Sequence, residues 1–160
     1  MTSAQENELP SQQLEQLIHN TIPLGKFMGL QVLDLTDNLI KLEAPVADNN
    51  INIHGTGFAG SIYSMCALTA WGFMHMRVLK ENITADVVIA RGEIRYLSPV
   101  KEKITCECDV EENHYNEFHQ RMLKQGKASI PVAVNVLEGV HLRAVLEARM
   151  SVIITSLENS

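Results

Sequence analysis

Apolar residues recur at helical spacing near the start of the chain. After Pro10, Ser11 is a suitable N-cap, and the positions that follow predict an amphipathic helix over residues 11–22. Pro23 and Gly25 come next and are expected to end it. The apolar stripe of this helix consists of Leu14, Leu17, Ile18 and Ile22.

Two short runs with the alternation of β-strands come next. "LQVLDLT" at 30–36 and "LIKLEAPV" at 39–46 flank the turn-forming pair Asp37 and Asn38, so the sequence predicts a β-hairpin. A loop rich in Asn and Gly follows.

From Ser61 to about Lys80, apolar residues cover every side of a helical wheel. Such a helix is buried either in a protein core or in a membrane. The span barely reaches membrane length and lies between predicted strands, so we expect a core helix. Its polar and charged residues include Ser64, Thr69, His75 and Arg77.

Four long β-rich runs make up most of the remaining chain, and "HYNEFHQRMLKQG" at 114–126 is either a short helix or a wide connection. One apolar helix among six strands can be hidden by a single curved antiparallel sheet. We therefore predict an α+β hotdog fold, one domain over residues 1–160 with roughly the first ten residues frayed. The β-rich runs are 85–100, 102–110, 127–139 and 140–155.

Composition narrows the class of protein. Hydrophobic residues make up 46% of the chain and charged residues 20%, which is ordinary for a globular domain. The 13 Lys and Arg against 19 Asp and Glu give a net charge of −6, which argues against nucleic acid or an anionic membrane as partner.

The cysteines and the first residues of the chain indicate the cellular compartment and its redox state. Cys66, Cys106 and Cys108 are odd in number, and "MTSAQENELP" has no basic segment followed by an apolar one. We expect a reduced, cytoplasmic protein. No CxxC or HxxxH pair predicts a metal site, and no cofactor is expected.

The stretch "NNINIHGTGFAGSIYSMCAL" at 49–68 carries the candidate chemistry. Glycine allows close approach to the backbone, and asparagine donates and accepts hydrogen bonds without ionising. Where the loop meets the helix, Gly60 and Ser61 offer N–H donors supported by the helix dipole. These groups are suited to hold a carbonyl oxygen or an anion.

"NINIHGTGFAGSIYSMCALTAWG" followed by "ARGEIRYLSPV" resembles the YiiD C-terminal-domain family, hotdog proteins of the acyl-thioester class. The resemblance runs from about Gly25 to Thr155. It implies an enzyme of fatty-acid metabolism acting on acyl-CoA or acyl-carrier protein. It also implies a homodimer or a dimer of dimers, with active sites between subunits.

One departure limits the predicted reaction. In the related phenylacetyl-CoA-type thioesterases, an Asn precedes a His-Gly-Gly and a catalytic Asp at fixed spacing. Aligning Asn52 with that Asn leaves neither a His nor an Asp at the expected positions, because Phe58 and Ala67 stand there. Hydrolysis needs water activated by a base, or a nucleophile.

The candidate site residues come from the loop and the start of the helix. Asn52 and Asn50 either bind a thioester carbonyl or satisfy loop backbone groups. His54 is a candidate general base or a solvated loop residue, and Asp48 is a weaker candidate base. Ser64 is expected to line the site. The remaining predicted substrate contacts are Thr56, Phe58, Gly60 and Ser61.

Arg91 and Arg95 lie four residues apart on one predicted strand and share a face, with Tyr96 on the other. They either form a basic rim for coenzyme A phosphates or an acidic carrier protein, or are scattered solvated charges. Other basic residues that would join such a rim are Lys101, Lys103, Lys124, Lys127 and Arg143.

Three functions remain open from the sequence. The family resemblance implies a thioesterase, and it also extends to decarboxylation of malonyl-carrier protein at the start of fatty-acid synthesis. The missing carboxylate favours this second reaction, in which a malonyl thioester becomes the acetyl thioester, because it needs stabilisation of an enolate but no activated water. The third is a non-catalytic module that binds acyl groups.

Overall fold

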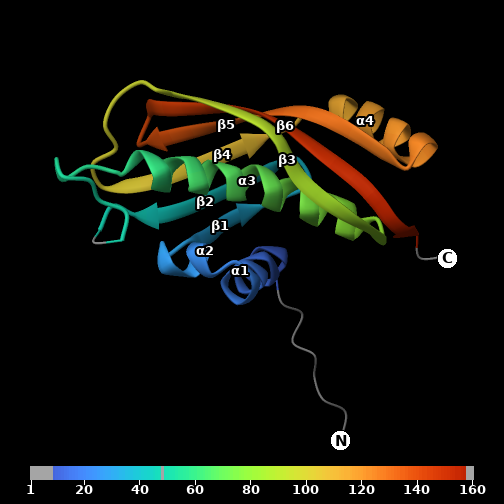
Figure 1. The fold of residues 1–160 in the computed structure, drawn as a ribbon, viewed down its shortest axis with the longest axis horizontal. Helices are drawn as coiled ribbons and strands as arrows, with labels where there is room; N and C mark the ends of the chain where they lie inside the picture. Colours follow the sequence, from blue (N-terminus) through green and yellow to red (C-terminus); the bar gives the residue numbers. More distant parts are fainter. Residues whose placement is uncertain (1–8, 48, 158–160) are drawn as a thin grey trace, which may run out of the picture.

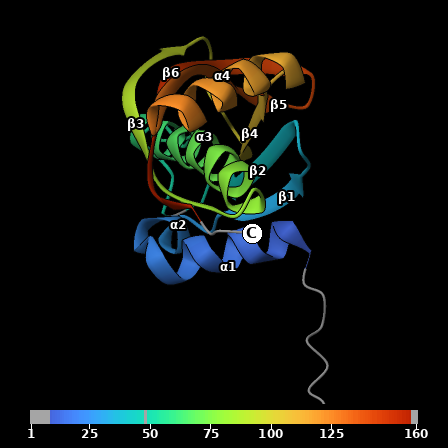
Figure 2. The ribbon, with the colours of Figure 1, turned by 90° about the vertical axis from the view of Figure 1, so that its right-hand side faces the viewer.

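A single antiparallel sheet curves around one long helix in the computed structural model, which describes residues 9–47 and 49–157 (Figure 1). The sheet has the strand order β1-β2-β4-β5-β6-β3. Viewed from one end, the strands enclose helix α3 from several sides (Figure 2). This is the α+β hotdog arrangement predicted from the order of elements. The strands are β1 (Gln31–Leu35), β2 (Leu39–Pro45), β3 (Ile83–Tyr96), β4 (Lys103–Asp109), β5 (Lys127–Glu138) and β6 (His141–Leu157).

Helix α3 (Ala59–Lys80) forms the centre of the core, and the predicted start at Ser61 is two residues late. The hydroxyl of Thr69 is fully buried and donates to the carbonyl of Met65 at 2.7 Å, so this polar side chain is satisfied within the helix. The guanidinium of Arg77 lies 3.8 Å from the ring centroid of Tyr115. Tyr115 comes from α4 (Glu112–Gln125), which confirms a helix in the segment whose structure the sequence left open.

The N-terminal helix begins one residue earlier than predicted. Helix α1 (Pro10–Thr21) has Leu9 as its N-cap, so the prediction that Ser11 caps it is wrong. Pro10 occupies the first helical position, where its fixed φ favours the helix and its missing N–H costs nothing. After Thr21 the chain forms a second short helix, α2 (Pro23–Phe27), which the sequence did not predict.

The two edges of the sheet differ. The carboxylate of Glu15 in α1 accepts the backbone N–H of Val32 in β1 at 2.8 Å, so this helix covers one edge. The other edge is β3, which pairs only with β6 among the described strands. An unpaired strand of this length is a template for pairing with another chain.

None of the helices in the described part of the chain is long and apolar enough to cross a membrane. The three cysteines are free and buried. The Sγ atoms of Cys66 and Cys106 lie 3.9 Å apart, and burial raises the pKa of Cys108 to about 12, so these thiols serve packing.

Truncating Phe73 tests the central position of α3. This ring is fully buried, so Phe73→Ala is expected to lower the free energy of unfolding by about 3–5 kcal/mol. Leu79 lies on the same helix but is 51% exposed, and Leu79→Ala is expected to cost about 1 kcal/mol or less. Denaturant unfolding followed by circular dichroism measures both. Equal losses would contradict the assigned faces of α3.

Candidate active site

The first turn of α3 has free hydrogen-bond donors. Its N-cap, Phe58, is extended with φ −67° and ψ 132°, and the Phe58 side chain cannot form a capping hydrogen bond. The first backbone N–H with a partner is that of Ile62, which donates to the Phe58 carbonyl at 3.0 Å. Within the described residues, the N–H groups of Ala59, Gly60 and Ser61 have no partner. Unpaired N–H groups at the positive end of a 22-residue helix favour an anion or a developing oxyanion.

Asn52 holds the loop that precedes this turn. Its Oδ1 accepts the backbone N–H of His54 at 2.9 Å and that of Thr56 at 3.1 Å. Its Nδ2 donates to the Thr56 hydroxyl at 3.0 Å and, more weakly, to the Gly57 carbonyl at 3.4 Å. Gly55 has φ +75°, a conformation that favours glycine. The side chain of Asn52 therefore bonds with its own loop.

Asn50 lies beneath the loop and is fully buried. Its Nδ2 donates to the carbonyls of Met28 at 2.7 Å and Pro45 at 2.9 Å, which uses both hydrogens of the amide. The backbone carbonyl of Asn50 accepts the backbone N–H of Phe58 at 2.8 Å. The Oδ1 of Asn50 is buried and has no partner among the described residues. Asn50 thus ties α2 and β2 to the start of α3, and no N–H of its amide remains for a substrate.

The other loop candidates lie closer to solvent. Phe58 is 52% exposed, and its ring lies against Gly60, where an added Cβ would come within 2.4 Å of the ring. His54 is exposed, and its backbone N–H donates to Asn52 Oδ1, its one hydrogen bond to the described residues. Asp48 lies outside the described residues. The Phe58 ring thus covers the backbone at Gly60, and the exposed His54 is accessible to solvent.

Two serines follow on α3. Ser64 is half-buried, and its hydroxyl donates to the carbonyl of Gly60 at 2.8 Å. Ser61 is 7% exposed. Ser64 thus lies one turn above the free N–H groups, as the sequence predicts, with its oxygen still able to accept a hydrogen bond.

Two tyrosines lie beside the first turn of α3, and the sequence did not predict either of them as part of the site. The hydroxyl of Tyr96 in β3 donates to the carbonyl of Ala59 at 2.8 Å, and burial raises the pKa of Tyr96, so it stays a donor. Tyr63 of α3 points at Gly92, where an added Cβ would lie 2.4 Å from its hydroxyl. A glycine in the interior of strand β3 is the signal that marks this close approach.

The neighbouring segment, residues 100–102, supports the loop through a backbone hydrogen bond. The carbonyl of Val100 accepts the N–H of Gly57 at 2.8 Å. Next to it, the carboxylate of Glu138 accepts the N–H groups of Lys101 and Glu102, both at 2.8 Å. Burial opposes ionisation of Glu138, but these N–H groups and Arg143 outweigh it and lower its pKa. The charged carboxylate thus fixes the segment against which the loop packs.

Arg91 and Arg95 lie outside this cluster. They share the outer face of β3, whereas Tyr96 points inward to α3, which confirms the predicted alternation. Arg91 pairs with Glu93 at 3.8 Å and Arg95 with Glu147 at 3.5 Å. The structure therefore separates these arginines from the loop and sets them among carboxylates.

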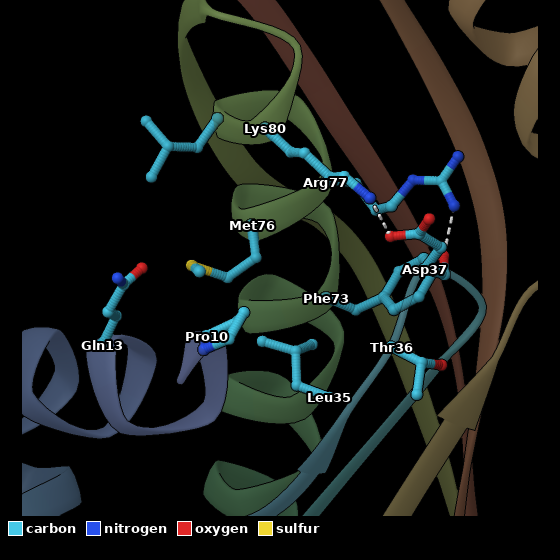
Figure 3. Close-up of a pocket in the computed structure, with 10 residues that line it drawn as sticks. Pro10, Gln13, Leu35, Thr36, Asp37, Phe73, Met76, Arg77 and Lys80 are labelled. Carbon is cyan, nitrogen blue, oxygen red and sulfur yellow. Dashed lines mark hydrogen bonds and ion pairs between the residues drawn. The ribbon is translucent and has the colours of Figure 1, made fainter. Parts of the chain in front are cut away.

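A cavity of about 300 Å³ lies at the other end of α3, away from the first turn (Figure 3). Its walls include Phe73 and Met76 of α3 and Leu35 of β1. The charged groups at its rim, Arg77 and Lys80, hydrogen-bond with Asp37. The residues of the Asn-rich loop do not line this cavity. No group of three metal-ligating side chains occurs within residues 9–47 and 49–157.

Known proteins share this fold and sequence pattern. The family described as "Putative thioesterase (yiiD_Cterm)" matches residues 11–153. The structure of a putative thioesterase from Shewanella oneidensis is 32% identical, with TM-score 0.80 over 90% of this chain and 97% of that one. A Chlorobaculum tepidum protein of unknown function is 24% identical, with TM-score 0.83 over 89% and 93% of the two chains. A probable thioesterase from Pseudomonas aeruginosa is 17% identical, with TM-score 0.79 over 91% and 97%.

The last two likenesses concern the fold alone, whereas the family match and the Shewanella relative concern the sequence as well. The family match covers the loop, the first turn of α3 and every strand to within a few residues of the end of β6. This chain is a hotdog-fold member of the YiiD C-terminal family of thioesterase-like proteins.

Proposed function

We propose that this protein acts on acyl thioesters of coenzyme A or of acyl-carrier protein at the first turn of α3. The observation that carries the proposal is the uncapped helix start, where the N–H groups of Gly60 and Ser61 are free. A thioester carbonyl placed there accepts these N–H groups, and its oxygen gains negative charge in the transition state. The family membership supports the same substrate class.

Hydrolysis is the first candidate reaction. Water attacks the carbonyl carbon, the N–H groups stabilise the oxyanion, and collapse of the tetrahedral intermediate breaks the C–S bond and releases the thiol and a carboxylic acid. His54 is the one imidazole in the loop 46–58 and is the candidate base that takes the proton from water. The exposed Phe58 and the half-buried Thr56 and Ser64 are the side chains that we expect to contact the acyl group.

Decarboxylation of a malonyl thioester is the second candidate, favoured by a specific observation. Helix α3 carries no Asp or Glu between Ala59 and Lys80, so it supplies no carboxylate to activate water. In this reaction the bond between the carboxylate carbon and the α-carbon breaks, CO₂ leaves, and the electron pair forms an enolate whose oxygen accepts the same N–H groups. A proton from water then gives the acetyl thioester.

We also propose that the protein is a homodimer paired through β3. The free edge of this strand supports pairing with a second copy. Beside it, α3 has a half-buried stripe that includes Ala67, Trp71 and His75, and the rings of Trp71 and His75 stack at 4.7 Å. A second subunit would cover this stripe and enclose the first turn of α3.

An assay of two products separates the reactions. A panel of acyl-CoA esters, malonyl-CoA and malonyl-carrier protein is incubated with the protein, while free thiol and product mass are followed. Hydrolysis predicts thiol and acid in equal amounts, with a loss of roughly 10²–10⁴ in kcat for His54→Ala. His141→Ala removes an exposed histidine on β6 and is the matched control.

Acetyl thioester appearing without thiol would replace hydrolysis by decarboxylation. Absence of turnover with every substrate, despite saturable binding of acyl-CoA, would contradict both reactions and leave an acyl-binding module.

Substitutions at Asn52 test whether this residue holds the loop or donates to the substrate. Asn52→Asp keeps an oxygen that accepts the N–H groups of His54 and Thr56, so we expect kcat within about tenfold of the parent protein. Asn52→Ala removes those bonds, and kcat is expected to fall by roughly 10²–10³ as the loop shifts. If Asp were as damaging as Ala, Nδ2 of Asn52 would be a donor to the thioester.

Asn50 is expected to act on stability. Asn50→Ala leaves the buried Met28 carbonyl and the partly buried Pro45 carbonyl without their donor, at a cost of about 1–3 kcal/mol for the buried one. The neighbouring Asn49 donates to the carbonyl of Phe27 in an exposed position, so Asn49→Ala is expected to cost below about 1 kcal/mol. Urea unfolding compares the two variants. An Asn50→Ala protein of unchanged stability but no activity would restore a direct catalytic role.

A further inference from the structure

Two hydroxyl groups donate to carbonyls in the first turn of α3. The Tyr96 hydroxyl donates to the carbonyl of Ala59, and the Ser64 hydroxyl donates to the carbonyl of Gly60, both at 2.8 Å. A carbonyl and the N–H of the following residue belong to one planar peptide unit. These two carbonyls therefore belong to the peptide units that carry the free N–H groups of Gly60 and Ser61.

A hydrogen bond accepted by an amide oxygen strengthens the N–H of the same amide as a donor. The bond favours the resonance form with negative charge on oxygen and positive charge on nitrogen, so the amide hydrogen becomes more positive. Hydrogen bonds linked in this way strengthen one another by roughly 10–30% per bond. An N–H that binds a developing oxyanion therefore binds it more strongly when the carbonyl of its peptide unit already accepts a donor.

The bond from Tyr96 is the unusual one of the two. Thr21 and Thr69 donate, as Ser64 does, to carbonyls four residues earlier in their helices, at positions outside this turn. Tyr96 instead reaches a carbonyl 37 positions away in the sequence. A carbonyl inside an α-helix accepts the N–H of the residue four positions later, and a second lone pair remains. The phenol thus adds a second donor to a carbonyl that the helix already uses.

The sheet places the phenol. Tyr96 is the last residue of β3 and lies opposite Ala144 of β6. The N–H groups of the next two residues, Leu97 and Ser98, both donate to the carbonyl of Arg143, at 2.8 and 3.1 Å. Burial raises the pKa of the Tyr96 phenol, so it keeps its proton at neutral pH. The position of this donor is therefore set by strand pairing and not by the Asn-rich loop.

We propose that Tyr96 is a positioning residue that holds the peptide unit between Ala59 and Gly60 and strengthens the Gly60 N–H as a donor to the substrate oxygen. The phenol acts through this peptide unit and not by contact with the reacting carbonyl. The inference rests on the proposed function, because it assigns the Gly60 N–H to an acyl thioester. It applies to hydrolysis and to decarboxylation alike, since the oxyanion and the enolate oxygen accept the same N–H.

NMR of the ligand-free protein tests the effect on the peptide unit. Tyr96→Phe removes the hydroxyl and keeps the ring. The carbonyl carbon of Ala59 and the amide nitrogen of Gly60 are expected to move upfield, because both nuclei lose the deshielding caused by a hydrogen bond to this carbonyl. Tyr115→Phe removes a phenol beside Arg77, at the other end of α3, and is the matched control that leaves both resonances in place. Unchanged Ala59 and Gly60 resonances in Tyr96→Phe would overturn the proposal.

Kinetics with a substrate that the parent protein turns over give the second readout. Tyr96→Phe is expected to lower kcat roughly two- to tenfold at unchanged KM, because the strengthened bond matters most in the transition state. Tyr115→Phe is expected to keep both constants, and circular dichroism establishes that each variant is folded. A raised KM at unchanged kcat would overturn the proposal, since the phenol would then bind the substrate itself. Unchanged kcat and KM would also overturn it, since the bond would then serve the fold alone.

The two readouts separate this inference from the proposed function. If no acyl thioester is turned over, the proposed function fails, and the resonances of Tyr96→Phe still decide whether the phenol polarises the peptide unit. If turnover occurs but Tyr96→Phe leaves the resonances or kcat unchanged, the proposed function stands and the role assigned to Tyr96 is wrong.

Discussion

Helix α3 is apolar on all sides, and the rest of the molecule is arranged to cover it. The sheet curves because a flat sheet would cover only one side of such a helix. The polar groups on its buried sides are satisfied within the helix, as for Thr69, or by α4, which pairs Glu112 with Arg77. Its first turn is the exception, because it begins without a cap. The unpaired backbone N–H groups of this first turn are therefore the part of α3 that can bind a ligand.

The polar loop before α3 is engaged mostly with itself. Asn52 bonds the backbone of its own turn, and Asn50 joins α2 and β2 beneath it. Since these side-chain amides already have partners, the free donors of the site are backbone N–H groups. Such groups are present whichever side chain a residue carries. A site of this type depends on the course of the backbone more than on the identity of one catalytic side chain. This fits the absence of a carboxylate from α3.

Much of the fold could be predicted from the sequence. The apolar helix, the hairpin around Asp37 and Asn38 and the later strands follow from periodicity and turn residues, because these signals are local. The start of α1 was one residue off, because Pro10 competes with Ser11 for the first positions. Among site residues, the glycine and serine at the helix start were predictable from loop-to-helix chemistry. The burial of Asn50 and the bond from Tyr96 to Ala59 were not, since their partners lie far away in sequence.

The most direct test of the account observes the N–H groups themselves. A ketone analogue of acetyl-CoA, with a methylene in place of the thioester sulfur, keeps the carbonyl but cannot be hydrolysed. Amide NMR spectra recorded during its titration are predicted to show the proton resonances of Gly60 and Ser61 moving downfield, as hydrogen bonds form to the carbonyl. Unchanged Gly60 and Ser61 resonances at saturation, with the shifts gathered instead around Arg77 and Lys80 at the far end of α3, would contradict it.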